Sequence, residues 1–295
     1  MKRIKAKTAR LNLTGALLLA GFALYVVLFF FPIIWSVYTS FKTPHNFVED
    51  PLWLPQKWVV SNYVTVFKEF AFTTTVNGQR YYILLTEMYM NSALYSLGAA
   101  FINTACCCLV AYLTAVFDWK FSKIIYQTVI VIMILPVVGT LPAALGLMRG
   151  LGLYDSLVGI YISSFSFLGM GYLIFYATFK QLPKSFIEAA KIDGATNLRV
   201  MLQVMLPMAA SAFSTLFLMN FVGRWNDYQT SLLWLPSRPT VAYGVFAFSF
   251  NQVGTIANVP MKLTGSMLLL LPVLIVFLAF HKRLLVNMTM GGLKE

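Results

Sequence analysis

The chain of 295 residues is 59% hydrophobic and 11% charged, with a mean hydropathy of +0.75. Soluble domains carry about 25% charged residues, so this composition excludes a soluble globular domain and predicts an all-α integral membrane protein. The net charge of +12 does not indicate a nucleic-acid partner, because the basic residues flank the apolar runs instead of covering one soluble face. The partner that composition implies is the lipid bilayer.

The apolar runs predict six transmembrane helices. A helix needs about 20 apolar residues to cross the hydrocarbon core of a bilayer, and runs of that length lie at about 11–38, 87–117, 124–147, 157–179, 208–235 and 263–280. The first run is too long for the apolar part of a signal peptide and lacks a convincing cleavage site. We therefore expect it to be retained as the first span.

The distribution of Lys and Arg predicts the orientation. Most of these residues lie in the N-terminus, in 118–123, in 180–206 and near the C-terminus, although the loops on the other side are longer. Cytoplasmic loops are enriched in Lys and Arg, so both termini are expected in the cytoplasm. The expected organisation is a basic N-terminus (1–10), a six-span domain (11–285) and a cytoplasmic tail (286–295).

Two connecting segments have structure of their own. In the loop at 42–85, Ser61–Phe70 predicts a short surface helix with Ser61 as its N-cap. The apolar stretch Val241–Phe250 is too short to cross a membrane, so we expect it to be re-entrant or interfacial. Aromatic residues of the first loop suit a membrane interface or, alternatively, contact with a docking partner or a sugar: Trp53, Trp58, Tyr63, Tyr81 and Tyr82.

Two prolines fall inside the expected third span. Pro136 and Pro142 predict a kinked helix, because proline removes a hydrogen bond and clashes with the preceding turn. The carbonyl groups that a kink frees are tolerated where neighbouring helices or a cavity satisfy them.

The longest polar segment between two spans, residues 181–207, predicts two short helices joined by a tight turn. Pro183 suits the first turn of a helix. Ser185–Ile192 then supplies helix formers, with the acidic Glu188 near the positive N-terminal end. Asp193-Gly194 is typical of a turn, because glycine tolerates a positive φ.

The second helix of this segment is expected to carry one apolar stripe. Its apolar residues recur with helical spacing, and Pro207 then opens the next span. The stripe comprises Leu198, Met201, Leu202, Met205 and Leu206. An elbow of this kind, lying flat on a membrane surface, offers a shape that another protein can grip.

Three parts of the segment in series are Glu188-Ala189-Ala190, Asp193-Gly194-Ala195 and Leu206-Pro207. They resemble the EAA loop in permease subunits of bacterial ATP-binding-cassette importers, whose pattern is EAA, two residues, DGA, about ten residues and LP. Asn91-Ser92, Trp225-Asn226-Asp227 and a glycine-bearing tail resemble the sugar-importer branch, to which the maltose transporter belongs. The resemblance covers about residues 12–295 in element order, although only the loop is highly specific.

The resemblance implies a type I ABC importer permease fold in which residues 181–207 form a cytoplasmic coupling elbow. The residues that would contact a groove of an ATPase subunit are Glu188, Ala189, Ala190, Asp193, Gly194 and Ala195. Small side chains allow close approach, and the carboxylates pair with basic groups or cap the local helices. Periodicity alone leaves open an ordinary amphipathic helix that rests on lipid.

The resemblance also implies partners. These are a second homologous permease subunit, two ATPase subunits, an extracellular solute-binding protein and a sugar, in a bacterial cell membrane. The same importer type for a non-sugar solute is the alternative. A passive channel or proton-coupled carrier is another alternative, but it would need acidic or histidine residues in several spans. The acidic residues of this chain lie mainly in loops, and Asp227 is the main exception. A structural membrane subunit without a transport path is a third alternative.

Polar residues within the expected fifth span are candidates for the substrate path: Asn220, Arg224, Trp225, Asn226, Asp227 and Tyr228. Charge inside a bilayer is costly and normally faces a bundle interior or water. An uncharged sugar is bound by hydrogen bonds and aromatic faces, and this stretch offers both. The alternative is an intrahelical pair between Arg224 and Asp227, three residues apart, that only holds helices together. Asn91, Asn103 and Thr104 are weaker candidates, because isolated polar residues often bridge helices.

No catalytic residue, cofactor or metal is expected. The sequence lacks a GxxxxGK[ST] phosphate loop, HExxH and Cys/His metal spacing, so ATP hydrolysis is expected on partner subunits. Cys106, Cys107 and Cys108 are adjacent in a span, point in different directions and are expected to pack as small apolar residues. The tail Asn287–Glu295 resembles the glycine-containing C-terminus of the family, which inserts toward the ATPases, but its ending departs from the usual Gly-Ala-x-Lys-Gly type.

Overall fold

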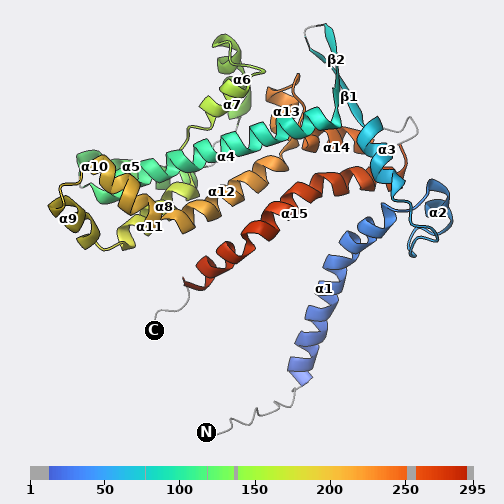
Figure 1. The fold of residues 1–295 in the computed structure, drawn as a ribbon, viewed down its shortest axis with the longest axis horizontal. Coiled ribbons are helices and arrows are strands. Elements are labelled where there is room, and N and C mark those ends of the chain that lie inside the picture. The colour runs from blue at the N-terminus through green and yellow to red at the C-terminus, as the bar shows by residue number, and fades with distance from the viewer. Residues whose placement is uncertain (1–12, 77, 118, 136–138, 251–256, 291–295) are drawn as a thin grey trace. The chain divides into compact units, whose positions relative to one another are not determined.

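A computed structural model describes residues 13–76, 78–117, 119–135, 139–250 and 257–290. The chain is mostly helical and divides into two units (Figure 1). The first unit contains the chain up to Val66 together with 252–268, and the second contains 67–251 together with the chain from Leu269 onward. Helices α3 (Ser61–Glu69) and α15 (Val259–Met290) contribute to both units.

Within the described residues, three helices are long and apolar enough to cross a membrane. They are α1 (Leu13–Thr39), α4 (Leu85–Val116) and the Val259–Ala279 part of α15. A fourth crossing results if the helices Asn197–Met208 and Ala210–Trp225, which meet at a bend of 72°, count as one span. The other expected spans are interrupted, so their helices are shorter.

The expected third span is two helices, and the prediction of one kinked helix was wrong. Helix α5 (Lys120–Ile134) ends before Leu135, and α6 (Thr140–Gly150) begins after Gly139. Pro142 lies in the first turn of α6, where the missing N–H has no helical partner to lose. Pro136 lies outside the described residues.

The expected fourth span is also two helices, α7 (Leu157–Ser163) and α8 (Met170–Gln181). Asn103 on α4 satisfies the backbone at this break: its Nδ2 donates to the carbonyl groups of Ser164 and Ser166 at 3.3 and 2.9 Å. Backbone carbonyl groups that leave a helix and are shielded from water need such partners. The role of Asn103 as a bridge between helices is therefore confirmed.

The fifth and sixth expected spans also differ from prediction, the fifth by an interruption and the sixth by its length. The fifth is interrupted at Asn226-Asp227, between α12 (Ala210–Trp225) and α13 (Tyr228–Trp234). Helix α15 continues to Met290, so Lys282 and Arg283 do not end it. The residues after Met290, including most of the glycine-bearing tail, lie outside the described part.

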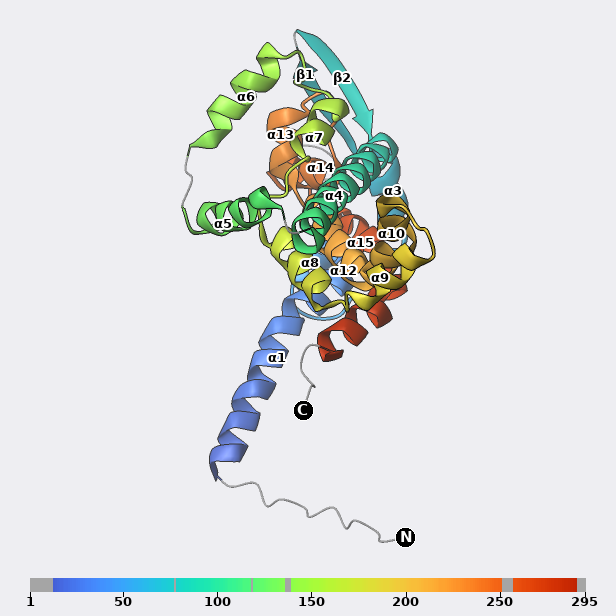
Figure 2. The same ribbon diagram turned by 90° about the vertical axis from the view of Figure 1, so that its left-hand side faces the viewer.

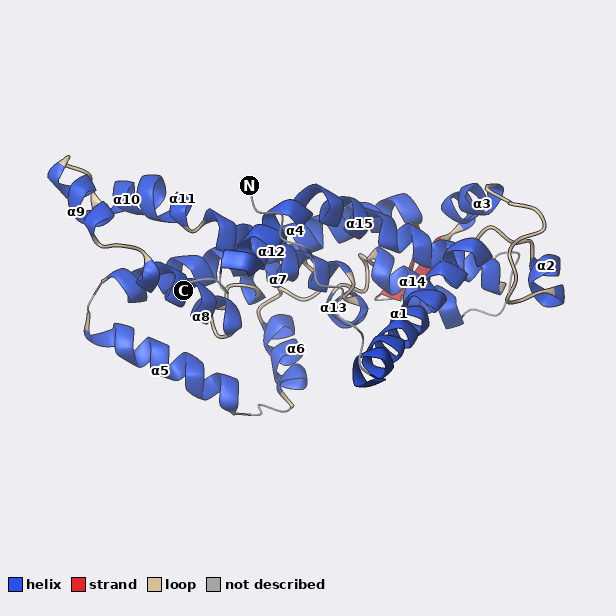
Figure 3. Cartoon of the chain, turned by 90° about the horizontal axis from the view of Figure 1, so that it is seen from below, coloured by secondary structure: helices blue, strands red, loops and turns tan. Residues whose placement is uncertain are grey.

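A two-stranded antiparallel hairpin corrects the all-α prediction. Strand β1 (Ala71–Val76) pairs with β2 (Gln79–Leu84), with Val76 opposite Gln79 (Figure 3, red). Gly78 has φ +80°. The dipeptide Asn77-Gly78 between β-branched and aromatic residues is a strong hairpin signal, because both central positions of a type I′ turn require a positive φ. The polar composition of the loop concealed this signal.

The hairpin packs on α14 (Val241–Phe250), which forms the short apolar helix that the sequence predicted. The rings of Phe72 and Tyr243 lie 4.9 Å apart, as do those of Phe70 and Phe248. On α14, Gly244 also permits a close approach to α4, because a Cβ at this position would lie 2.6 Å from the Met88 sulfur.

Helix α4 is the central element of the second unit, and α8 and α12 pack along it (Figures 1 and 2). Its buried face is rich in small residues, which let neighbouring helices approach closely: Ala99, Ala100, Ala111 and Ala115. Cys107 and Cys108 are buried on it and Cys106 is half-buried, all three as free thiols, as expected. The Thr114 and Tyr172 hydroxyl groups, 2.8 Å apart, link α4 to α8.

In the first unit, buried polar groups organise the chain that follows α1. The Nδ2 group of Asn62 on α3 donates to the carbonyl groups of Ser40 and Lys42, at 2.8 Å each. The Thr264 hydroxyl donates to the Ser40 carbonyl at 3.0 Å. Lys42 is fully buried, and its ammonium donates to the Asp50 carbonyl.

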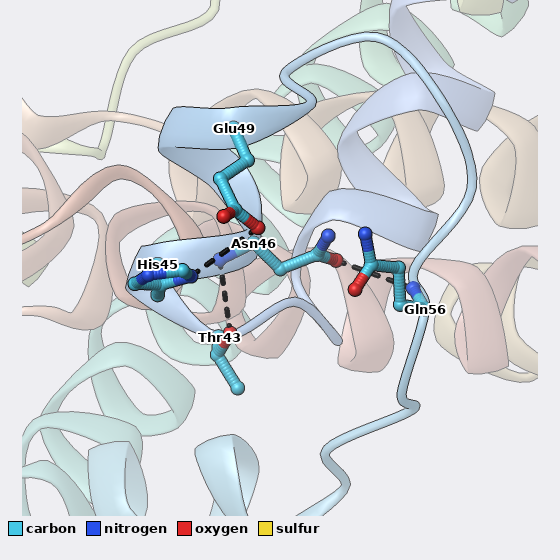
Figure 4. Close-up of polar contacts among 5 residues, drawn as sticks. All are labelled: Thr43, His45, Asn46, Glu49 and Gln56. Atoms are coloured by element: carbon cyan, nitrogen blue, oxygen red, sulfur yellow. Dashed lines mark hydrogen bonds and ion pairs between the residues drawn. The ribbon is translucent and has the colours of Figure 1, made fainter.

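Helix α2 (Pro44–Glu49) continues this ordered loop (Figure 4). The Thr43 hydroxyl caps it by accepting the Asn46 N–H at 3.1 Å, and the Asn46 Oδ1 accepts the N–H of Gln56 at 3.3 Å. His45 and Glu49 form an exposed pair with a nitrogen–oxygen distance of 3.3 Å. Helix α3 occupies the predicted stretch, but Ser61 is its first residue rather than its cap.

Candidate functional site

The elbow at 181–207 has the two short helices and the tight turn that its sequence predicts. Helix α9 (Ser185–Ile192) ends in a Schellman motif with Gly194 at φ +78°. The Gly194 N–H donates to the Lys191 carbonyl at 3.0 Å, and the Ala195 N–H donates to the Ala190 carbonyl at 2.9 Å. Glycine is required at this position because its φ is positive. The turn therefore depends on the DGA part of the motif.

The beginnings of the elbow helices depend on residues that differ from those predicted. Pro183 precedes α9 instead of occupying its first turn, and its carbonyl accepts the Phe186 N–H at 3.3 Å. The Thr196 hydroxyl caps α10 (Asn197–Val200) by accepting the Arg199 N–H at 3.3 Å. This cap was not predicted, although threonine before a helical run is a typical signal.

One face of α9 is anchored to the core and the other is exposed. Ile187 and Ala190 pack against a core that contains residues of α4 and α8 together with Val200, Met205 and Ala209. Glu188 and Ala189 are exposed on the opposite side. Ile192, one turn beyond Glu188, is 86% exposed, which is unusual for a large apolar side chain at a helix end. Ile192 was not among the residues predicted to contact a partner.

The apolar stripe predicted for the second elbow helix is confirmed in part: Met205 is buried, and Met201 and Leu206 pack against the same core. Residues Met201–Met205 form a π-helical turn, which rotates the residues that follow it. Leu198 and Leu202 are 60% and 51% exposed, whereas Val200 and Ala209, which were not part of the predicted stripe, are buried. A helical period of 3.6 assumes an uninterrupted α-helix, so it predicted only part of the buried face.

Behind the elbow lies a groove of about 210 Å³ between α9 and the ends of α4 and α8. Its floor is apolar, with Phe117 and Phe179 among the lining residues, and Lys180, Lys184 and Lys191 also line it. Within the described residues no ion pair joins Glu188 to these lysines, so its carboxylate is available to a partner.

The polar residues of the expected fifth span lie at the break between α12 and α13. Asn226 is the C-cap of α12, and its Nδ2 donates to the Val222 carbonyl at 2.9 Å. Asp227 is the N-cap of α13 and accepts the Thr230 N–H at 3.1 Å. The predicted pair with Arg224 does not form in the described structure; the Tyr95 hydroxyl donates to the Asp227 carboxylate at 2.9 Å instead.

Three other path candidates are engaged in packing. Trp225 is 4% exposed, and its indole N–H donates to the Leu269 carbonyl at 3.1 Å. The Asn220 Nδ2 donates to the Thr104 hydroxyl at 3.1 Å. The ring of Tyr228 stacks on Phe246 at 4.0 Å. These contacts favour a structural role for most of the set. Within the described residues, the half-buried Arg224, the Oδ1 of the exposed Asn226 and the Tyr228 hydroxyl have no hydrogen-bond partner.

Two lines of similarity to known proteins cover this region. The family described as binding-protein-dependent transport system inner membrane component matches residues 107–285, which include the elbow and the α12–α13 break. A solved structure of a bacterial ABC transporter involved in the import of the acidic polysaccharide alginate matches with a TM-score of 0.74 and 21% identity. That match covers 91% of this chain and 95% of the other, and at this identity it shows the fold alone.

Individual relatives match over almost the whole chain. The diacetylchitobiose uptake system permease protein of Streptomyces coelicolor is 26% identical, covering 91% of this chain and 85% of that protein. The arabinooligosaccharides transport system permease protein of Bacillus subtilis is 27% identical, covering 92% and 93%. The trehalose/maltose transport system permease protein of Thermococcus litoralis is 26% identical, covering 94% and 96%.

The family match and the helical fold agree with the motif that the elbow carries. The matched range spans more than half of the chain, and several apolar helices are long enough to cross a membrane. The chain is thus a multi-pass membrane protein, and it belongs to the family of binding-protein-dependent transport system inner membrane components.

Proposed function

We propose that the chain is the permease subunit of an ATP-driven importer and that its elbow transmits the work of ATP hydrolysis. The observation that carries this proposal is the two-sided geometry of α9. Ile187 and Ala190 fix the helix to the core, while Glu188, Ala189 and Ile192 face outward. A helix that is rigidly anchored on one side and exposed on the other can transfer a displacement of its partner to α4 and α8.

The cargo is a sugar or an oligosaccharide. The relatives that support this choice are named for diacetylchitobiose, arabinooligosaccharides, and trehalose or maltose. The solved structure of similar fold belongs to an importer of a polysaccharide. These names favour a sugar over the alternative of a non-sugar solute. The chain itself is a transport component and not an enzyme.

The proposed assembly contains this subunit, a second homologous permease, two ATPases and an extracellular solute-binding protein. The chain crosses the membrane six times, with both termini in the cytoplasm; α5 with α6 and α7 with α8 then form broken spans. This orientation places the elbow, with its three Lys and Arg residues (Lys184, Lys191 and Arg199), and the preceding Lys180 on the cytoplasmic side.

The transport cycle follows from this arrangement. Closure of the ATPases on ATP draws the elbows together and opens the pathway outward, and hydrolysis returns it to the inward-facing state. The loaded binding protein advances this cycle only through different affinities for the two states. In the membrane, Arg224 and Asn226 contribute to the pathway, because the Arg224 guanidinium and the Asn226 Oδ1 lie at a helix break and have no hydrogen-bond partner within the described residues.

Co-purification with the ATPases tests the coupling proposal. The chain would be co-expressed with the second permease, ATPase and binding protein encoded beside it, as wild type and as Glu188→Lys. Because like charges across an interface cost several kcal/mol, we expect ATPase recovery with Glu188→Lys to fall at least about tenfold. Uptake of diacetylchitobiose, maltose and trehalose into proteoliposomes tests the cargo.

The matched control is Glu49→Lys, the same change at an exposed carboxylate on α2. It should leave ATPase recovery unchanged. If Glu188→Lys recovers as much ATPase as wild type, α9 is a helix that rests on lipid. If no sugar is taken up by an intact complex, the cargo assignment is wrong while the coupling assignment stands.

A further inference from the structure

Helix α4 extends from the elbow region to the hairpin (Figure 1). A second pocket lies at its hairpin end, opposite to the groove behind the elbow. Helix α4 has 32 residues, so about 48 Å separate its ends at 1.5 Å per residue. The pocket has a volume of about 370 Å³ and lies between β2, the first turns of α4 and the loop that joins α13 to α14. Pockets that bind small molecules typically measure about 300–1,000 Å³.

The loop that forms one wall is fixed by hydrogen bonds from distant parts of the second unit. Asp155, a non-glycine residue at φ +57°, accepts the Ser237 N–H at 3.1 Å, and its own N–H donates to the Trp234 carbonyl at 3.1 Å. The Asn91 Nδ2 donates to the Pro239 carbonyl at 3.2 Å. The strained backbone at Asp155 and these bonds indicate a preorganised wall rather than a mobile loop.

The opposite walls come from the hairpin and from α4. Ile83 is buried and fixes β2, while the exposed rings of Tyr81 and Tyr82 contribute to the lining. Glu87, in the first turn of α4, is exposed at the pocket. The pocket is thus assembled from three segments that are far apart in the sequence.

The chemistry of the lining is complementary to a polyhydroxylated ligand. Glu87 supplies only hydrogen-bond acceptors and Arg238 only donors. Within the described residues neither side chain has a hydrogen-bond or ion-pair partner. A hydroxyl group both donates and accepts, so a neutral sugar ring satisfies both, while the Tyr82 ring covers its apolar face. Glu87 disfavours an anionic ligand.

We propose that this pocket binds one ring of a neutral saccharide on the outer side of the permease, as a first contact for sugar released by the binding protein. The inference rests on the proposed function for its orientation and its ligand class. Glu87 and Arg238 bond to the hydroxyl groups, Tyr82 covers the ring, and the Asn91 Oδ1 provides a further acceptor.

Saturation-transfer NMR on the intact complex in nanodiscs tests the proposal. Diacetylchitobiose, maltose and trehalose would each be added without the binding protein to wild type, Glu87→Gln and Arg238→Gln. We expect at least one sugar to bind the wild type and both variants to bind it at least about tenfold more weakly, since hydrogen bonds to charged groups contribute about 1.5–3 kcal/mol. Arg80→Gln, at an exposed position on β2 outside the pocket, is the matched control and should bind like the wild type.

Each outcome decides between two explanations. Absence of a signal from all three sugars overturns the proposal. So does a loss of affinity for the empty binding protein in Glu87→Gln and Arg238→Gln, because it would identify a protein-docking surface. Binding without uptake supports the pocket and counts against the proposed function. If the complex takes up sugar but both variants bind sugar like the wild type, the proposed function is supported and the pocket proposal is overturned.

Discussion

The hydroxyl group of Tyr95 on α4 donates a 2.9 Å hydrogen bond to the carboxylate of Asp227, the residue between α12 and α13. Tyr95 is 1% exposed, and Asp227 also caps α13 through the Thr230 N–H. The contact joins residues 132 positions apart in the sequence. The break between α12 and α13 is therefore held to the central helix by one carboxylate that also caps α13.

A double-mutant cycle with Tyr95→Phe and Asp227→Asn measures this contact. Each single change should lower the free energy of unfolding by about 1–2 kcal/mol, because a buried hydrogen bond to a charged group is lost. The double variant should lose about 1 kcal/mol less than the sum. The measurement is reversible unfolding in mixed detergent micelles.

Tyr228→Phe is the control for this cycle, since no hydrogen bond of its hydroxyl group is present in the described structure. It should change the free energy of unfolding by less than about 0.5 kcal/mol. Strict additivity of the Tyr95 and Asp227 changes would mean that the hydrogen bond does not contribute to stability.

The elbow could be predicted from the sequence because its signals are local. Glycine at Gly194 dictates the turn, and the EAA and DGA residues lie within one helix and its cap. The π-helical turn at 201–205 could not be predicted, since it depends on how Met205 fits the core. The partner of Asp227 was equally hidden, because no sequence pattern connects it to Tyr95.

The spans were predicted by hydropathy, which detects apolar length but not interruption. Gly139 and Gly169, both with backbone conformations outside the helical region, precede helices at breaks that hydropathy averages over. The hairpin was missed for a different reason: its Asn77-Gly78 signal is strong, but the polar composition of 42–85 led to the prediction of a loop.

Gly194→Ala should loosen the elbow without unfolding the rest of the chain. An alanine at φ +78° costs about 1 kcal/mol or more. Hydrogen exchange of 185–200 should accelerate about fivefold or more, and ATPase stimulation by the loaded binding protein should fall.

Gly146→Ala is the matched control, because Gly146 lies inside α6 and a Cβ there meets nothing within 4 Å. It should slow exchange in α6, since alanine is favoured over glycine in a helix by about 0.5–1 kcal/mol. Equal exchange of the elbow in wild type and Gly194→Ala would contradict the role assigned to the Schellman motif.

Ile192→Ser tests the exposed apolar residue of the elbow. At 86% exposure the side chain contributes little to the stability of the isolated subunit, so the melting temperature should not change. Affinity for the ATPase should fall by about 1–2 kcal/mol, because an apolar contact in the interface is lost. Val48→Ser, at 81% exposure on α2, should leave this affinity unchanged. Unaltered ATPase affinity in Ile192→Ser would place the residue outside the interface.

The buried Lys42 predicts that the free energy of unfolding of the first unit depends on pH. Burial lowers the pKa of its ammonium group from the ordinary value of 10.5, and the nearby Asp50 carboxylate raises it to a smaller extent. Between the lowered pKa and 10.5, the unfolded chain binds more protons than the folded chain. The free energy of unfolding therefore rises with pH across that interval.

Lys42→Met removes this titration and preserves most of the side-chain volume. The melting temperature of wild type relative to Lys42→Met should increase as the pH is raised from 8 toward 10.5, measured by tryptophan fluorescence. Lys57→Met, in the same loop, is the control, and its melting temperature should follow the wild type at every pH. Parallel pH profiles for wild type and Lys42→Met would show that Lys42 is not buried in solution, because only a desolvated ammonium group has a lowered pKa at this position.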